Sequence, residues 1–162
     1  MEQNLIQILM YTESDKEKKM GYTNNWHQKD DFTDTEFNKL AKHTKKMIKF
    51  FEEELEINFT QVEIQCNFSD KFASDGNINF ISFNGDKQND LDHETFIFEQ
   101  IKREKYDYET DDDYDNLGAF NFCKTNRKPY DALVWNILRK AYQIAPKKIS
   151  IGNDDGVRFH AL

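Results

Sequence analysis

The chain has 162 residues, of which 30 are acidic and 22 basic, so its formal net charge is −8. A chain of this length suits one domain, here over residues 1–162, with a core that buries about two thirds of the unfolded surface. The excess of negative charge disfavours non-specific binding to nucleic acid or to an anionic membrane, and it favours a partner with a basic surface or a cationic ligand.

The use of cysteine is typical of a reducing compartment. Cys66 and Cys123 form neither a disulfide framework nor a zinc pattern. The N-terminus carries Glu2 rather than the basic residues of a secretion signal, and no apolar run approaches the roughly 18 residues of a membrane span. We therefore predict a cytoplasmic protein that contacts no membrane and holds neither a metal nor a cofactor.

The first predicted element is a short apolar strand over residues 5–11. Residues 12–31 are polar and charged, which predicts a surface loop in which Trp26 packs back onto the protein as an anchor. This loop leads to the start of the first helix.

A capping box predicts where that helix begins. Thr33 can accept a hydrogen bond from the backbone of Glu36, whose side chain reaches back to the Thr33 backbone. Phe32 and Phe37 occupy the positions of a hydrophobic staple. Apolar residues continue at helical spacing to about Leu55, with lysines mostly on the opposite side, which we interpret as a solvent-exposed helix face.

Three strands are predicted after the helix. Residues 62–68 alternate apolar and polar side chains, which places Val62 and Cys66 on the buried face of a strand. Residues 78–83 and 95–98 form two further strands. We expect neighbouring strands to pair antiparallel.

Residues 104–118 form a strongly acidic segment. Its central part, 106–115, holds six carboxylates, three tyrosines and no cation, which predicts an extended, solvated loop. The aspartates match the opening of a calcium loop, but Asn116 replaces its turn glycine and Phe122 its bidentate glutamate, so calcium binding is rejected. Two interpretations stay open. The segment is a plain solvated loop, or it docks to a basic protein or imitates nucleic-acid phosphates through Asp111, Asp112, Asp113 and Asp115.

The C-terminal part begins with a strand over residues 120–124. Pro129 and the N-cap candidate Asp131 then start a second helix, which Pro146 ends before a last strand over 149–151. Strands that lie between two helices in the sequence predict an α+β fold. We expect a single two-layer domain, with a mostly antiparallel sheet of about five to six strands and both main helices packed on one face.

His93, Glu94 and Cys123 are the candidate catalytic residues. A cysteine and a histidine are the minimum for a thiol nucleophile, and Glu94 could orient the imidazole. The residues that flank Cys123 match neither the papain-like nor the caspase pattern, so the signal has low specificity. A metal site is disfavoured because His93 and Cys123 would need two more ligands.

The segment between the strand over residues 120–124 and the second helix is a candidate anion site. Lys124, Arg127 and Lys128 lie directly before a helix N-terminus, where backbone N–H groups and the helix dipole favour a phosphate. Tyr130 and Asp131 complete the candidate ligand-binding set, although the Asp131 carboxylate opposes an anion. The alternative is that Arg127 pairs with Asp131 or with the acidic segment.

Four motifs occur in order in the C-terminal half: Ser82-Phe-Asn-Gly85, His93-Glu-Thr-Phe96, Phe122-Cys-Lys-Thr125 followed by Arg127-Lys-Pro-Tyr-Asp131, and Asp155-Gly156. This succession resembles a family of small proteins encoded by tailed bacteriophages. The resemblance implies a non-structural phage protein that acts inside the infected bacterium, and it carries over no catalytic residue. The long acidic segment departs from the family's pattern.

Two classes of function follow. In the first, which we favour, the chain is a phage accessory or counter-defence protein that binds a host protein or a phosphate-bearing nucleotide in the host cytoplasm. In the second, it is a small enzyme that acts on a nucleotide or phosphorylated substrate through His93, Glu94 and Cys123. An enzyme should bring these three side chains together around one pocket, whereas a buried Cys123 would argue against it.

Overall fold

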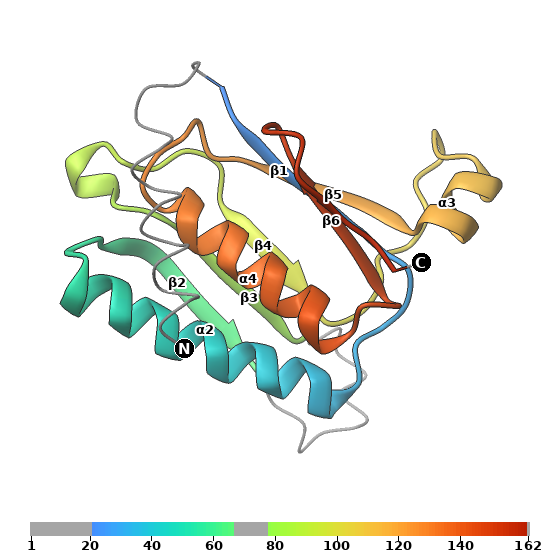
Figure 1. Cartoon of the computed structure of the whole chain (residues 1–162), viewed down its shortest axis with the longest axis horizontal. Coiled ribbons are helices and arrows are strands. Elements are labelled where there is room, and N and C mark those ends of the chain that lie inside the picture. The colour runs from blue at the N-terminus through green and yellow to red at the C-terminus, as the bar shows by residue number, and fades with distance from the viewer. Residues whose placement is uncertain (1–20, 67–77, 162) are drawn as a thin grey trace.

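The computed structural model describes residues 21–66 and 78–161 (Figure 1). In this part of the chain, three α-helices and seven β-strands form an α+β fold, as predicted. The strand predicted over residues 5–11 lies outside the described residues. The helices are α2 (Asp34–Glu54), α3 (Asp111–Leu117) and α4 (Asp131–Ile144).

The strands form two sheets rather than the single sheet expected. One has the order β5-β1-β6-β7 and the other β2-β3-β4, and every pair of neighbours is antiparallel, as predicted. The first sheet consists of β1 (Thr23–Gln28), β5 (Ala119–Lys124), β6 (Ile149–Asn153) and β7 (Arg158–Phe159). The second consists of β2 (Phe59–Gln65), β3 (Phe80–Gly85) and β4 (Phe96–Glu99).

Helix α2 begins as the capping box predicts. The backbone N–H of Glu36 donates to Thr33 Oγ1 at 3.1 Å, and the backbone N–H of Thr33 donates to Glu36 Oε1 at 2.8 Å. Phe32 and Phe37, the two staple residues, are both buried. Lys148 Nζ also donates to Glu36 Oε1 at 2.7 Å, so the helix start is held to the segment before β6.

Helices α2 and α4 pack against each other (Figure 1). His43 Nε2 and Asn136 Oδ1 lie 2.8 Å apart between them. Helix α4 also contacts β6 and β1, while α2 contacts β2, so the helix pair touches strands of both sheets. The apolar side of each helix is buried, as the helical spacing predicts, and includes Leu40, Phe51 and Leu138.

Aromatic rings join the two sheets. Trp26 of β1 is 2% exposed, which confirms its prediction as an anchor. Its ring centroid lies 5.4 Å from that of Phe96 and 6.0 Å from that of Phe98, both in β4. Phe83 and Phe59 extend this aromatic cluster across the second sheet.

The surface loop predicted over residues 12–31 is wrong in its described part, because β1 lies within it as an interior strand of the first sheet. Side-chain burial alternates along β1, but two of its buried side chains are the amides of Asn24 and Gln28. These amides find partners inside the protein, since Asn24 Nδ2 donates to Asp131 and Gln28 Nε2 donates to the carbonyl of Gln100. Because two of the inward side chains of β1 are polar, the alternation of apolar and polar residues that predicts a strand is absent here.

Strand β2 starts three residues before its predicted start at Val62 and also differs in the side chains that face inward. Its pairing with β3 shifts register between Thr60 and Glu63, where Gln61 has a φ of 54°. An irregularity of this kind changes which side chains face inward. Val62, expected on the buried face, is therefore 44% exposed, and Cys66 is half-buried.

The acidic segment 104–118 is not the extended loop expected, because it contains helix α3. Thr110 is the N-cap of this helix and accepts a hydrogen bond from the backbone N–H of Asp113 at 3.1 Å. Aspartates in the first turn also face the positive end of the helix dipole. Local capping thus offsets the repulsion on which the loop prediction rested.

Cations within and just before the segment neutralise part of its charge. Arg103 donates to both carboxylate oxygens of Glu109, at 2.6 and 2.9 Å, and Lys105 Nζ lies 2.6 Å from Asp111 Oδ1. The hydrogen bonds from Arg103 are the main reason that the pKa of the Glu109 carboxyl falls to about 2. The Arg103 guanidinium also lies over the ring of Tyr106, 3.9 Å from its centroid.

Candidate functional site

Residues from the sequence motifs meet around the end of β3, the start of β4 and the end of β5. Asn84 Nδ2 donates to the carbonyl of His93 at 2.9 Å and to Thr95 Oγ1 at 3.2 Å, while the backbone N–H of His93 donates to Asn84 Oδ1 at 3.1 Å. A Cβ on Gly85 would lie 1.9 Å from the carbonyl oxygen of Leu91, so only glycine fits there. This packing explains why the Asn-Gly pair ends β3.

Three residues form a clasp between β4 and β5, which we call the β4–β5 clasp: His93, Glu94 and Lys124. The backbone N–H of Glu94 donates to the Lys124 carbonyl at 3.2 Å, and the backbone N–H of Lys124 donates to Glu94 Oε2 at 2.8 Å. His93 Nδ1 lies 2.9 Å from the same carbonyl. Because a carbonyl only accepts, Nδ1 carries a proton in this contact, and the ring is exposed.

Cys123 is close to the clasp but buried beneath it. Its side chain is 1% exposed, and Sγ donates to the carbonyl of Glu94 at 3.5 Å. The Tyr130 hydroxyl donates to the same carbonyl at 2.7 Å. Burial, with the negative charges of Glu94 and Asp131, raises the pKa of the Cys123 thiol to about 12. A thiol in this state supplies almost no thiolate near neutral pH, and thiolate is the nucleophilic form.

Asp131 does not cap helix α4, contrary to its prediction. The N-cap is Tyr130, whose side chain makes no capping hydrogen bond, and Asp131 is the first helical residue. The Asp131 carboxylate is buried, where Oδ1 accepts hydrogen bonds from Asn24 Nδ2 and from Thr125 Oγ1, each at 2.5 Å. It therefore ties the helix start to β1 and to the residue after β5, and its negative charge in the first turn disfavours a bound anion there.

Arg127 pairs with Asp155, which was not among the partners expected from the sequence. Its guanidinium lies 3.4 Å from Asp155 Oδ1 and over the ring of Tyr22, 4.1 Å from the centroid. The backbone at Asn126 and Arg127 has φ values of 52° and 57°, which turns the chain between β5 and α4. Arg127 thus connects this turn to the Asp-Gly motif after β6.

The two lysines of the candidate anion site face different surroundings. Lys124 is exposed, and its Nζ lies 5.9 Å from the ring centroid of Phe122. Lys128 is half-buried, and its Nζ donates to the Asp90 carbonyl at 3.1 Å. The side chains of Lys124, Arg127 and Lys128 thus lie next to three different groups: a ring, a carboxylate and a backbone carbonyl.

The acidic residues predicted to contact a partner lie on helix α3, which contacts β5. Asp111 pairs with Lys105, while Asp112, Asp113 and Asp115 are exposed to solvent. Over the described ranges, no group of three or more His, Cys, Asp or Glu side chains is arranged to hold a metal ion.

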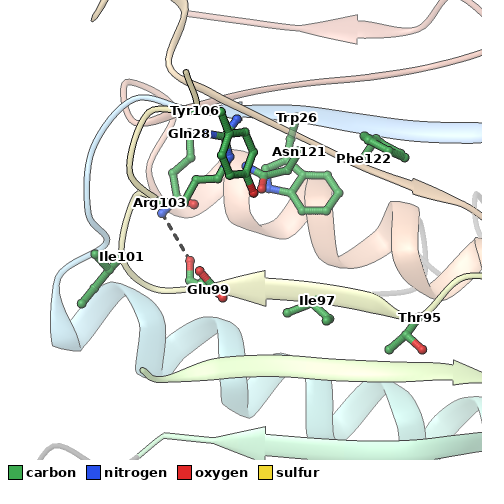
Figure 2. Close-up of a pocket in the computed structure, with 10 residues that line it drawn as sticks. All are labelled: Trp26, Gln28, Thr95, Ile97, Glu99, Ile101, Arg103, Tyr106, Asn121 and Phe122. Atoms are coloured by element: carbon green, nitrogen blue, oxygen red, sulfur yellow. Dashed lines mark hydrogen bonds between the residues drawn. The ribbon is translucent and has the colours of Figure 1, made fainter. Parts of the chain in front are cut away.

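A cavity of about 380 Å³ lies where β4 and β5 separate, beyond the β4–β5 clasp. Figure 2 shows Ile97 and Glu99 of β4 on one side of it and Phe122 of β5 with Trp26 of β1 on the other. Arg103 reaches the cavity from the segment after β4. None of the three candidate catalytic residues lines this cavity.

Three exposed apolar side chains form what we call the β4–β5 patch: Ile97 and Phe122, which line the cavity, and Phe120, which stacks on Phe122. Ile97 and Phe122 are each 50% exposed, and Phe120 is 42% exposed. The rings of Phe120 and Phe122 stack with centroids 5.9 Å apart. Sequence reasoning missed this patch because it followed Cys123 and its charged neighbours. The signal that could have found it is the two-residue spacing of the phenylalanines, opposite in phase to Cys123.

No family model matches the chain, and neither a curated protein nor a solved structure matches it. Within the described ranges, no helix is long and apolar enough to cross a membrane. The functional argument therefore rests on the site itself.

Proposed function

We propose that this chain is a binding protein whose contact surface is the β4–β5 patch. The observation that carries the proposal is the exposure of Ile97, Phe120 and Phe122 together beside a cavity. Exposed apolar groups that gather on one surface are typical of sites that contact another protein. Aromatic side chains are also the residues that most often dominate binding energy at such sites.

The cellular setting belongs to the same proposal. The ordered motifs resemble those of small non-structural proteins of tailed bacteriophages, so we place the chain in the cytoplasm of an infected bacterium as an accessory or counter-defence factor. Its partner there is a host protein. The exposed carboxylates of α3 and the net charge of −8 favour a partner with basic residues.

Catalysis by the thiol is the weaker alternative. Cys123 is buried, its thiol pKa is about 12, and it bonds to a backbone carbonyl rather than to His93. The Glu94 carboxylate accepts from the Lys124 backbone and does not orient the imidazole. These contacts hold β4 to β5, which is a structural role.

A phosphate-bearing ligand is a second candidate, favoured by one observation. The exposed His93 ring is oriented by the Lys124 carbonyl, and the Lys124 side chain is also exposed, so an imidazole and an ammonium from neighbouring backbone positions could contact one phosphate. Titration calorimetry with inorganic phosphate and with nucleotides tests this candidate. Binding that disappears in Lys124→Glu would support it, and the absence of heat would reject it.

The main proposal is tested by affinity capture from infected and uninfected bacterial lysates. We expect a defined host protein to be retained by the native chain and lost, by about tenfold or more, with the double variant Phe120→Ser and Phe122→Ser. Val62→Ser is the matched control, since Val62 is also exposed but lies on β2. Equal retention by the double variant and the control, with melting temperatures that show folded protein, would contradict the proposal.

A further inference from the structure

We infer that the gap between β4 and β5 receives an extended peptide segment of the partner, which adds to the sheet edges as a β-strand. This inference rests on the proposed binding function and specifies its mode. It follows from the direction of backbone groups on the two strands, which exposed side chains alone do not reveal. Strand addition uses main-chain hydrogen bonds for affinity and alternate side chains for specificity.

The edge of β5 that faces the gap is unpaired at its middle. The backbone N–H of Thr125 donates to the Tyr22 carbonyl at 2.9 Å, so the backbone groups of Thr125 point to β1. Because these directions alternate along an antiparallel strand, the groups of Cys123 also point to β1 and those of Phe122 point to the gap. No described residue bonds to the backbone N–H or C=O of Phe122.

The edge of β4 that faces the gap also directs backbone groups into it. The backbone N–H of Gln100 donates to the Asn79 carbonyl at 2.9 Å, so this N–H and the backbone groups of Phe98 point to β3. The alternation then directs the N–H and C=O of Ile97 into the gap. They too lack a partner among the described residues. Ile97 and Phe122 thus present unpaired donors and acceptors from opposite sides of the cavity (Figure 2).

Side chains and backbone already occupy both ends of these edges. At one end the β4–β5 clasp joins the strands. At the other, Arg103 donates to the Phe120 carbonyl at 2.9 Å and Gln28 Nε2 donates to the Glu99 carbonyl at 3.3 Å. Free strand edges are templates for pairing with another chain, and proteins usually cover them. Among the described residues, the middle of these edges, over the cavity, stays open to a strand.

The surroundings of the gap define the chemistry of the occupant. Every second side chain of an added strand would lie on the same side as Ile97 and Phe122, both half exposed, and should be apolar. The exposed carboxylates of Asp112, Asp113 and Asp115 lie on α3, next to the start of β5. The occupant is therefore an extended apolar segment with basic residues at the end that reaches α3.

The test uses a displayed library of random linear peptides of about ten residues, the length of a long strand. We expect enriched peptides to alternate apolar residues and to carry lysine or arginine at one end. Synthetic copies should slow hydrogen exchange at the Ile97 and Phe122 amides of the full chain by about tenfold or more. N-methylation of alternate peptide residues should weaken binding in either phase, since each phase faces one of the two edges.

A charge variant tests the orientation of the peptide. Asp112→Asn, Asp113→Asn and Asp115→Asn together should weaken binding of the enriched peptides by about tenfold at low salt, with a smaller loss at high salt. The matched control neutralises the three exposed glutamates at the end of α2 and should leave affinity unchanged: Glu52→Gln, Glu53→Gln and Glu54→Gln. An equal loss in both variants would reject the proposed orientation.

Some outcomes would overturn the inference of strand addition and leave the proposed binding function intact. If the host protein is captured but neither amide is protected, the partner binds the patch without adding a strand. If both amides become protected as protein concentration rises, with dimers in sedimentation, the occupant is a second copy. If no peptide is enriched but an oligoribonucleotide binds, the surface stacks bases instead. Failure of capture together with failure of enrichment would overturn both proposals.

Discussion

Cys123 and Cys66 differ in accessibility although burial raises the pKa of both thiols. Cys123 is 1% exposed and bonds to a backbone carbonyl, whereas Cys66 is half-buried. At about pH 8, iodoacetamide should therefore modify Cys66 in the folded protein and leave Cys123 unmodified, because alkylation needs an accessible thiolate. Peptide mass spectrometry locates the label. Denatured protein, modified at both positions, is the control, and rapid labelling of folded Cys123 would revive the thiol-enzyme alternative.

Asp131 is a buried carboxylate that satisfies two donors rather than capping its helix. Asp131→Ala would leave Asn24 Nδ2 and the Thr125 hydroxyl without this acceptor inside the core. We expect the free energy of unfolding to fall by about 2–4 kcal/mol, measured by urea denaturation. Asp112→Ala, at an exposed position, should change it by less than about 0.5 kcal/mol. Similar small effects of both substitutions would contradict the buried role.

At the scale of elements, helix α3 depends on charge as well as on its cap. The pKa of Glu109 is about 2 in the folded protein against an ordinary value of 4.5, because Arg103 and the Tyr106 backbone donate to its carboxylate. A depressed pKa means that the stabilisation is present above about 4.5 and is lost as the pH falls from there towards 2.

We therefore expect the α3 amides to exchange faster as the pH is lowered through this window, after correction for intrinsic exchange rates. Hydrogen exchange of residues 111–117, compared with that of α4, measures the effect. Glu109→Gln, which cannot ionise, should remove this pH dependence and show fast exchange throughout. An unchanged α3 at low pH in the native chain would show that the Thr110 cap suffices alone.

The sequence predicts well those elements that are determined by contacts between residues close together in the chain. The start of α2 follows from a box of neighbouring residues, Thr33 and Glu36, and its partners are within one helical turn. Strand β1 escapes prediction because the burial of Asn24 depends on Asp131, 107 positions away. The division into two sheets, and with it the cavity, depends on where β4 and β5 touch, which no local pattern contains.

The same difference between local and long-range contacts applies to the candidate site. The sequence grouped His93 and Glu94 with Cys123 as candidate catalytic residues, but in the structure both side chains contact backbone atoms of Lys124. Arg127 finds Asp155 only because a turn of left-handed residues folds it towards the end of β6. Residue type alone could not separate ligand-binding groups from groups that hold strands together.

At the scale of the whole molecule, Trp26 couples two sheets that share few backbone contacts. Its ring belongs to β1 of the first sheet and packs on Phe96 and Phe98 of the second, and it is almost fully buried. Helices α2 and α4 reinforce this connection because they contact strands of both sheets. A shared core of this kind predicts one cooperative unfolding transition, with the same midpoint for probes in either sheet.

Trp26→Ala tests this coupling, because it removes the ring that fills the space between the sheets. We expect a loss of about 3–5 kcal/mol in the free energy of unfolding, typical of deleting a buried aromatic side chain. Native-state hydrogen exchange at Trp26's neighbours in β1 and at Ile81 in β3 should then become faster together, by a similar factor. Trp26→Phe, which keeps a ring, should lose less. If β1 exchanges faster while β3 keeps its protection, the sheets unfold independently, and the gap between β4 and β5 would open by separation of two units rather than accept a strand within one.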